Sequence, residues 1–189
     1  MTPGDGFFEE QIGGPDPAEV SAAAEMAAQV LVRGARAGGD HAVADRVLHL
    51  AETEGLETLA DLWSGAPADS LAGCLWRLYL LRTWVHADPL EAARQFDAGR
   101  SRATVAGVIA GVAEPPGPDE LKVMADHVLT GIVQADFADV LFRAAAFAQV
   151  VAAGRALTEE ASTDSASRMQ HLADDLASAA RQELSVGLA

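Results

Sequence analysis

Residues 71–86 read LAGCLWRLYLLRTWVH, and this stretch indicates the fold class of the chain. At 100° per residue, its apolar side chains fall on every side of a helix. A helix that is apolar all round belongs at the centre of a domain, because none of its faces suits water. Arg77 and Arg82 would point about 140° apart on this helix. We therefore expect a central helix whose two arginines pair separately with carboxylates or extend to the rim, since burying an unpaired guanidinium is very costly.

Helix start and stop signals flank this stretch on both sides. Asp16-Pro17 is typical of a helix start and Gly38-Gly39 of a helix end. Similar signals predict further helices over residues 40–55, 57–64, 89–98, 101–112, from 118 to a break at 134–136, from there to about 157, and over about 164–184. No stretch shows the alternating β-branched pattern of a strand. The chain therefore predicts an all-α fold, a compact multi-helix bundle of eight to nine helices.

Composition divides the chain into a tail and one domain. Residues 1–15 are rich in Gly and Pro and show no periodic pattern, which is typical of a flexible N-terminal tail. The length of 189 residues, of which 50% are hydrophobic, suits one domain with a sizeable core. We therefore expect residues 16–189 to form a single helical domain, with the last helix at its periphery.

The net charge of −15 is unevenly distributed along the chain. Residues 1–70 carry −10 and residues 114–189 carry −7, whereas residues 71–113 carry +2 because five arginines there outnumber three acidic side chains. We expect ion pairs to hold this mildly basic centre against the acidic flanks. The overall acidity also excludes direct nucleic-acid binding, which needs clustered Lys and Arg against the phosphates.

Arg94, Arg100, Ser101 and Arg102 form the candidate ligand-binding site of the sequence. Arg100 and Arg102 flank Ser101, the expected N-cap of the helix over 101–112. The N–H groups at a helix start favour a phosphate or carboxylate, and the arginines would add to that preference. The alternative interpretation is that these arginines are exposed beside a loop and contribute little.

Ala103, Gly107 and Gly111 lie four residues apart on one face of the predicted helix over 101–112. Gly inside a helix costs about 1 kcal/mol relative to Ala, so two of them indicate a packing requirement. Close approach of a second backbone is the usual one. We interpret this face as a tight internal crossing, with a homodimer contact as the second interpretation.

The chain offers no strong catalytic or metal-binding motif. His41, Asp45, His49 and Glu52 lie on one helix face, but over three turns they cannot all reach one ion, so we expect no metal site. Cys74 is the only cysteine and lies in the apolar stretch, where burial would make its thiol inert. The sequence lacks phosphate-binding loops, dinucleotide fingerprints and zinc-protease or di-iron motifs. We therefore expect no catalytic residues and no cofactor.

The tail contains two adjacent aromatic residues, Phe7 and Phe8, in an acidic stretch flanked by glycines. An exposed Phe pair in a flexible tail is able to dock into a groove on a partner protein. It would otherwise fold back on its own domain or have no role. Phe7 and Phe8 are therefore the candidate partner-binding residues.

Targeting and membrane signals are also absent from the sequence. Residues 1–14 are acidic and lack the basic and apolar regions of a signal peptide. The most apolar stretch, residues 71–85, contains two arginines and falls short of the roughly 20 residues needed to cross a bilayer. The single cysteine suits a reducing compartment. We therefore expect a cytoplasmic protein that does not bind membranes.

Three stretches resemble a family of small, uncharacterised helical proteins from actinobacteria; they read LWRLYLLRTWVHADPLEAARQF, VAGVIAGVAEPPGPDEL and DFADVLFRAAAFAQVVAAGR. The resemblance covers residues 70–157 in outline. It implies an all-helical fold and assigns no functional residue, because no activity is known for the family. The basic side chains of the sequence are nearly all arginine, which fits the high-GC codon usage of such organisms.

These observations favour a non-enzymatic, cytoplasmic helical protein that acts as a protein–protein interaction or regulatory module through an acidic surface. The alternative is a helical protein that binds a small anionic ligand in a pocket near Arg94–Arg102. The two hypotheses make different demands on the fold. A deep pocket lined by those arginines would favour the ligand, whereas arginines that are paired or solvated would favour the interaction module.

Overall fold

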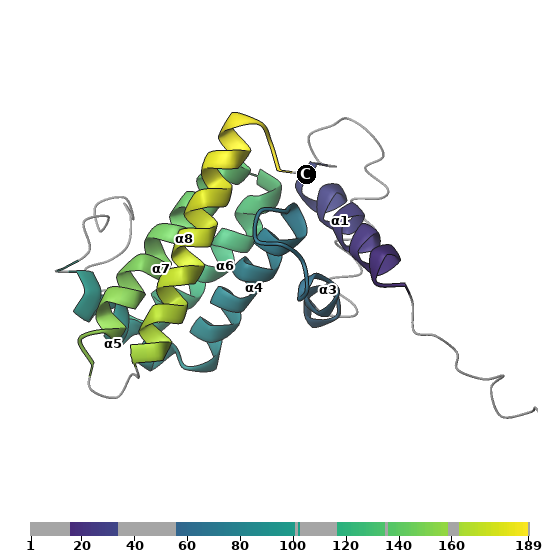
Figure 1. Ribbon diagram of the computed structural model, residues 1–189. Helices are drawn as coiled ribbons and strands as arrows, with labels where there is room; N and C mark the ends of the chain where they lie inside the picture. The colour runs from purple at the N-terminus through teal and green to yellow at the C-terminus, as the bar shows by residue number, and fades with distance from the viewer. Residues whose placement is uncertain are drawn as a thin grey trace, which may run out of the picture.

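Seven helices run through the part of the chain that the computed structural model describes, residues 16–33, 56–100, 102, 117–134, 136–158 and 163–188. They are α1 (Pro17–Arg33), α3 (Leu56–Trp63), α4 (Leu71–Ala87), α5 (Pro89–Arg100), α6 (Pro118–Gln134), α7 (Phe137–Arg155) and α8 (Thr163–Ser185) (Figure 1). The described residues contain no strand, so the predicted all-α class is confirmed. The predicted helices over 40–55 and 101–112 and the tail over 1–15 lie outside these ranges, which leaves seven helices where eight to nine were expected.

The helices begin where the sequence predicts. Four side chains just before helices accept a backbone N–H bond 3.0–3.1 Å long from the first turn; they belong to Asp16, Ser70, Asp88 and Asp136. Proline occupies the first position of α1, α5 and α6, where its missing N–H has no partner to lose. Short polar side chains and proline therefore set the boundaries of these helices.

The expected central helix, α4, contacts each of the other six described helices, while α7 is the helix with the largest buried share among those described. Of the 19 residues of α7, 14 are buried, whereas α4 buries 8 of 17. The difference comes from side-chain size. Alanines let neighbours approach α7 from several sides, while Trp76 and Tyr79 on α4 stack with ring centroids 5.8 Å apart on a half-buried face, beside Leu80, which is 38% exposed.

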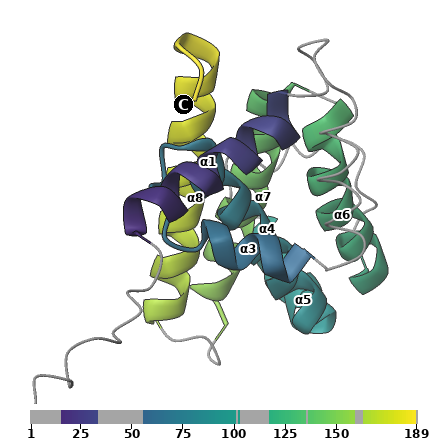
Figure 2. The same ribbon diagram turned by 90° about the vertical axis from the view of Figure 1, so that its right-hand side faces the viewer.

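Helix α8 packs lengthwise against α7 and is part of the core rather than peripheral to it. The two helices lie side by side in both views (Figures 1 and 2). The predicted apolar stripe on α8 faces this contact, since Met169, Leu176 and Ala180 are buried and Leu172 packs against them. The last helix therefore supplies one wall of the core.

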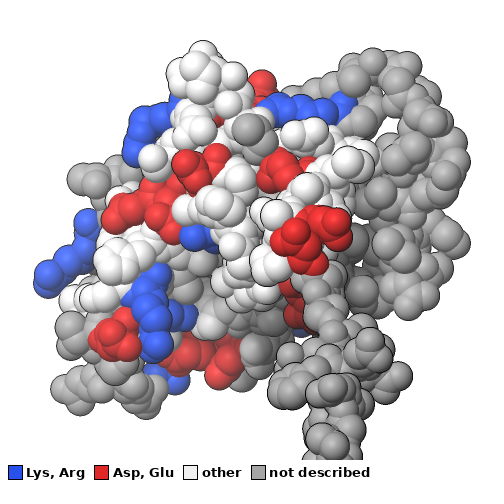
Figure 3. Space-filling view, turned by 45° about the vertical axis from the view of Figure 1, so that its right-hand side comes forward, with Lys and Arg blue, Asp and Glu red and all other residues white. Residues whose placement is uncertain are grey.

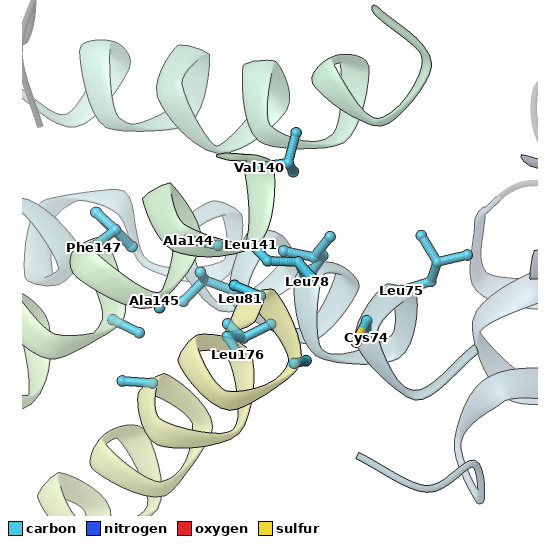
Figure 4. Close-up of a cluster of buried hydrophobic side chains, with 14 of the residues drawn as sticks. Cys74, Leu75, Leu78, Leu81, Val140, Leu141, Ala144, Ala145, Phe147 and Leu176 are labelled. Carbon is cyan, nitrogen blue, oxygen red and sulfur yellow. The ribbon is translucent and has the colours of Figure 1, made fainter. Parts of the chain in front are cut away.

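The core lies where α4, α7 and α8 meet. Figure 4 shows side chains from all three helices gathered there, with Cys74, Leu75, Leu78 and Leu81 from α4, Val140, Leu141, Ala144, Ala145 and Phe147 from α7, and Leu176 from α8. Phe147 also stacks on Phe96 of α5 with ring centroids 5.3 Å apart. Burial of these side chains is the main favourable term in the stability of the domain.

By length and composition alone, α7 is apolar enough to cross a membrane. The sequence analysis instead identified residues 71–85 as the most apolar stretch of the chain. However, 72% of the apolar window of α7 is buried inside the protein, where α8 and α5 cover it. This burial fits the core helix of a folded domain.

Two glycines let α5 and α7 cross at backbone contact. A Cβ atom on Gly99 would overlap the carbonyl oxygen of Val150, and one on Gly154 would overlap the carbonyl oxygen of Gln95. Gly99 therefore lies inside α5, although the sequence predicted that it would end the helix near residue 98. The other predicted crossing, at Gly107 and Gly111, lies outside the described residues.

Replacing Gly99 by alanine should destabilise the protein by about 1–3 kcal/mol, because the methyl group can fit only if α5 and α7 move apart. Helix propensity alone would favour alanine by about 1 kcal/mol, so the two effects have opposite signs. Urea unfolding followed by circular dichroism measures the difference. Gly65→Ala is the matched control, because nothing lies within 4 Å of a Cβ at that position. A Gly99→Ala variant as stable as the parent would contradict the close crossing.

Candidate functional site

The two arginines of α4 pair separately with carboxylates, as the sequence predicted. Arg77 donates from Nε to Asp175 of α8 over 2.9 Å, and Arg82 donates from Nε to Asp126 of α6 over 2.7 Å. Arg77 also donates to the carbonyl of Gly73 over 3.0 Å. Both carboxylates belong to the acidic C-terminal part of the chain. The mildly basic centre is thus held against an acidic flank by complementary charges.

Asp126 is shared by two donors from α4. Its Oδ1 atom accepts from Arg82 and lies 3.0 Å from Nε2 of His86. Burial by itself raises the pKa of Asp126, but the hydrogen bonds from Arg82 and His86 outweigh it and hold the pKa below its ordinary value. The carboxylate therefore stays charged and fixes α6 against the second half of α4.

The depressed pKa of Asp126 predicts a loss of stability in acid. The contribution of the Asp126 carboxylate to the free energy of unfolding is complete above the unfolded-state pKa of about 3.9. It is lost as the pH falls through the lower folded-state pKa. Asp126→Asn should cost less than about 1 kcal/mol near pH 7, since the side chain is 44% exposed. The difference from the parent should be smaller below the unfolded-state pKa of about 3.9 than at pH 7, as measured by urea unfolding at the two pH values.

Asp174→Asn is the control for this prediction, because its exposed carboxylate accepts a hydrogen bond only from the neutral Gln170 in the described structure. It should leave stability nearly unchanged at either pH. A gap between parent and Asp126→Asn that is the same at both pH values would contradict the assigned ion pair.

A further ion pair joins the two ends of the described chain. Arg33 at the end of α1 donates to both carboxylate oxygens of Glu183 near the end of α8, with the Nη2–Oε2 distance 2.7 Å. Arg33 also donates to the carbonyl of Leu188 over 3.2 Å, and the Leu188 N–H donates to Glu183 over 2.8 Å. The hydrogen bond to Glu183 is the main reason that the pKa of Arg33 is raised. The sequence reasoning did not predict this contact, which links the two acidic flanks.

The predicted site at Arg94, Arg100, Ser101 and Arg102 is only partly described. Arg94 pairs with Glu91 over 3.2 Å and Arg100 pairs with Asp97 over 3.7 Å, in each case three residues apart on α5. Arg102 is exposed, and Ser101 lies outside the described residues. Arg94 and Arg100 thus each pair with a carboxylate of their own helix.

The cation that the sequence reasoning missed is Arg155, which is buried at the end of α7 and only 8% exposed. Its Nε donates to Gln95 Oε1 over 2.7 Å, and its Nη1 donates to Ser165 of α8, over 3.1 Å to Oγ and 3.3 Å to the carbonyl. Its guanidinium lies 4.5 Å from the ring centroid of Trp84. Burial lowers the pKa of Arg155. Four helices, α4, α5, α7 and α8, therefore converge on one guanidinium.

Helical spacing held a signal for Arg155. Positions 144, 148, 151 and 155 lie at steps of four, three and four residues, which places Arg155 on the same face as Ala144, Ala148 and Val151. All three of those residues are fully buried. An arginine that continues a buried stripe at a helix C-terminus has a favourable dipole and needs polar partners.

The thiol of Cys74 is enclosed by the core. The side chain is fully buried, and burial raises its pKa to about 12. The Sγ atom lies 3.6 Å from the carbonyl oxygen of Ala68. This agrees with the predicted structural role for the residue.

Cys74 should therefore resist alkylation by iodoacetamide at pH 8 in the native state and react fully in urea, as measured by mass spectrometry. The fraction modified within an hour should be at least about 100-fold lower in the folded protein, because both burial and the raised pKa suppress the thiolate. Rapid labelling without denaturant would show that the thiol is accessible.

The remaining candidates from the sequence, the histidine-containing helix face and the Phe pair of the tail, lie outside the described residues. No cluster of three or more metal-ligating side chains occurs within the described ranges. His41, Asp45, His49 and Glu52 lie outside those ranges, as do Phe7 and Phe8 of the tail.

Comparisons of the chain with protein-family models, curated proteins and solved structures found no match. The resemblance to small helical actinobacterial proteins stays a prediction. A functional proposal therefore has to come from the charges and contacts of the chain itself.

Proposed function

We propose that this protein is a non-enzymatic, cytoplasmic interaction module that presents an acidic helical surface to a basic partner protein. The main support is how the basic side chains are used. Of the eleven Lys and Arg residues in the described ranges, seven pair with carboxylates inside the chain; these are Arg33, Arg77, Arg82, Arg94, Arg100, Lys122 and Arg168. Internal pairing leaves the exposed carboxylates to set the surface potential of a chain with net charge −15.

The exposed carboxylates lie on neighbouring elements. Asp69 precedes α4 and Asp174 lies on α8, and both are exposed. Gln182 of α8 donates to the Asp69 carbonyl over 3.5 Å, which places the start of α4 beside α8. Glu25 of α1 accepts from the Ala72 N–H over 3.3 Å, which brings α1 to the same end of α4. These contacts place Asp69 and the partly buried Glu25 at the start of α4, beside α8 and α1.

Figure 3 gives the corresponding view of the surface. Acidic side chains lie across the middle of the face shown there, whereas basic side chains lie mostly along its upper and left margins. A surface of this kind attracts a basic protein at long range and raises the association rate at low salt. It repels nucleic acid and a second copy of the same acidic face.

The non-enzymatic and cytoplasmic parts of the proposal rest on other grounds. Many of the described ionisable side chains form helix caps or ion pairs within and between helices, which are structural roles. The single cysteine is buried in the core, which suits a reducing compartment.

Affinity capture from native lysate at 50 mM and 300 mM salt tests the proposal. The parent protein should retain a basic protein at low salt and release it at high salt. The double variant Asp69→Asn/Asp174→Asn should weaken retention about 5-fold or more, because each exposed charge pair contributes up to about 1 kcal/mol.

The matched control is Glu120→Gln/Asp139→Asn, which changes the net charge by the same amount at exposed positions on α6 and α7. It should retain the partner as the parent does. Equal losses for the two double variants would mean that only net charge matters, and retention that is indifferent to salt would contradict an electrostatic partner surface.

A further inference from the structure

One face of α4 is apolar and reaches the surface of the protein. At 100° per residue, positions 76, 80, 83 and 87 fall within about 60° of arc. Leu80, Thr83 and Ala87 on this line are exposed, Leu80 by 38%. Trp76 begins the line and is half-buried, and Tyr79 stacks on it. We call these five residues the outer stripe of α4; the opposite face of the helix carries the buried side chains that Figure 4 shows.

The spacing of the outer stripe suits packing against another helix. Steps of four, three and four residues from position 76 to position 87 keep side chains on one line. The same steps form the seam of a coiled coil, where apolar residues of two helices interlock. The stripe is about 17 Å long, since a helix rises about 1.5 Å per residue. Trp and Tyr, which begin the stripe, are the residue types that dominate the binding energy of many protein interfaces.

The outer stripe is uncharged in a strongly acidic chain. Every residue of α4 is described, and its exposed residues, Leu80, Thr83 and Ala87, carry no charge. Each of the other six described helices exposes at least one acidic side chain; examples are Glu19, Asp61, Asp97, Glu120, Asp139 and Asp174. With a net charge of −15, two copies of the chain repel each other through such surfaces. Among the described helices, α4 therefore opposes the approach of a second copy least.

Ion pairs with no net charge flank the outer stripe. Arg77 on one side pairs with Asp175, and Arg82 on the other side pairs with Asp126. All four side chains are partly exposed, so the apolar stripe has a polar border. An apolar, aromatic centre with a polar border is the usual composition of a protein–protein interface. A border with equal numbers of positive and negative groups suits a copy of itself, whereas a partner of opposite charge would be favoured by a border of one sign.

We propose that two copies of this protein associate through the outer stripe of α4, with the two α4 helices packed against each other about a two-fold axis. In such a contact each copy contributes the same residues, so Trp76, Tyr79 and Leu80 of one copy lie against the stripe of the other. The contact buries aromatic and aliphatic surface that is exposed in the single chain. It uses neither Asp69 nor Asp174, so it does not depend on the proposed binding of a basic protein.

Sedimentation velocity of the full chain from about 1 to about 200 µM tests the proposal. We expect the average mass to rise from that of a monomer toward that of a dimer as the concentration increases. Added salt should leave the dimer unchanged or strengthen it, because ions screen the repulsion between two acidic copies. The proposed capture of a basic protein weakens with salt, so the failure of one proposal can be distinguished from the failure of the other.

Substitutions at the centre of the stripe locate the contact. Leu80→Glu and Leu80→Lys should each weaken dimerisation about 10-fold or more, because each places like charges close together across the two-fold axis. An equimolar mixture of these two variants should dimerise again, since the facing charges then attract. Leu184→Glu is the matched control, because it adds the same charge at a leucine of α8 that is 66% exposed. It should dimerise as the parent does.

Circular dichroism checks that each variant is folded, and Thr83→Glu, at another exposed position of the stripe, takes the place of Leu80→Glu if that variant does not fold. A parent protein that stays monomeric over the whole concentration range would overturn the proposal and would mean that another partner or another part of this chain covers the stripe. So would a dimer that Leu80→Glu leaves intact, because the contact would then lie elsewhere. Equal losses for Leu80→Glu and Leu184→Glu would also overturn it, because they would indicate an effect of net charge alone.

Discussion

The rest of the fold depends on how closely α7 approaches its neighbours. Gly154 of α7 and Gly99 of α5 allow backbone contact between these helices, and the alanines of α7 allow α8 to pack along its length. A core built from small side chains gains less hydrophobic free energy from each buried residue, but it packs many backbone atoms closely. Dispersion and shape complementarity therefore take the place of large aromatic contacts. This arrangement brings the end of α7 and the start of α8 together, which is why an arginine there is buried among four helices.

Ion pairs between helices hold the outer helices against this closely packed core. Arg77 and Arg82 leave α4 on different sides and reach α8 and α6, while Arg33 reaches from α1 to α8. Each pair fixes the orientation of an outer helix against the core, although partly exposed pairs contribute modestly to stability. Because so many basic side chains are engaged within the chain, the excess of acidic ones remains at the surface. The same contacts that organise the fold therefore shape the electrostatic surface.

Much of the fold followed from local sequence rules, because caps, prolines and apolar periodicity act within a few residues. Asp16, Ser70, Asp88 and Asp136 begin helices for reasons that the sequence states directly. The separate pairing of Arg77 and Arg82 followed from their angular spacing. The partners of those arginines did not, nor did the deep burial of α7, because both depend on which helices meet in space. The candidate site followed least, because the sequence pointed to Arg94–Arg102 whereas the buried cation is Arg155. Its helical spacing with Ala144, Ala148 and Val151 is visible in the sequence, but its partners on α4, α5 and α8 depend on the tertiary contacts.

Helix α1 is held to the core by few buried side chains, which favours partial unfolding in which α1 separates from the core. Only Ala24, Ala28 and Val32 of this helix are buried, and the Trp63 indole donates to the Ala24 carbonyl over 3.1 Å. Few buried side chains hold α1 compared with α7, so separation of α1 exposes less apolar surface than separation of α7 from α8 and is the easier of these two partial openings. Because Arg33 holds Glu183 and Leu188, that opening also releases the end of α8, 150 residues away along the chain. The stability of the last turn of α8 is therefore coupled to the attachment of α1.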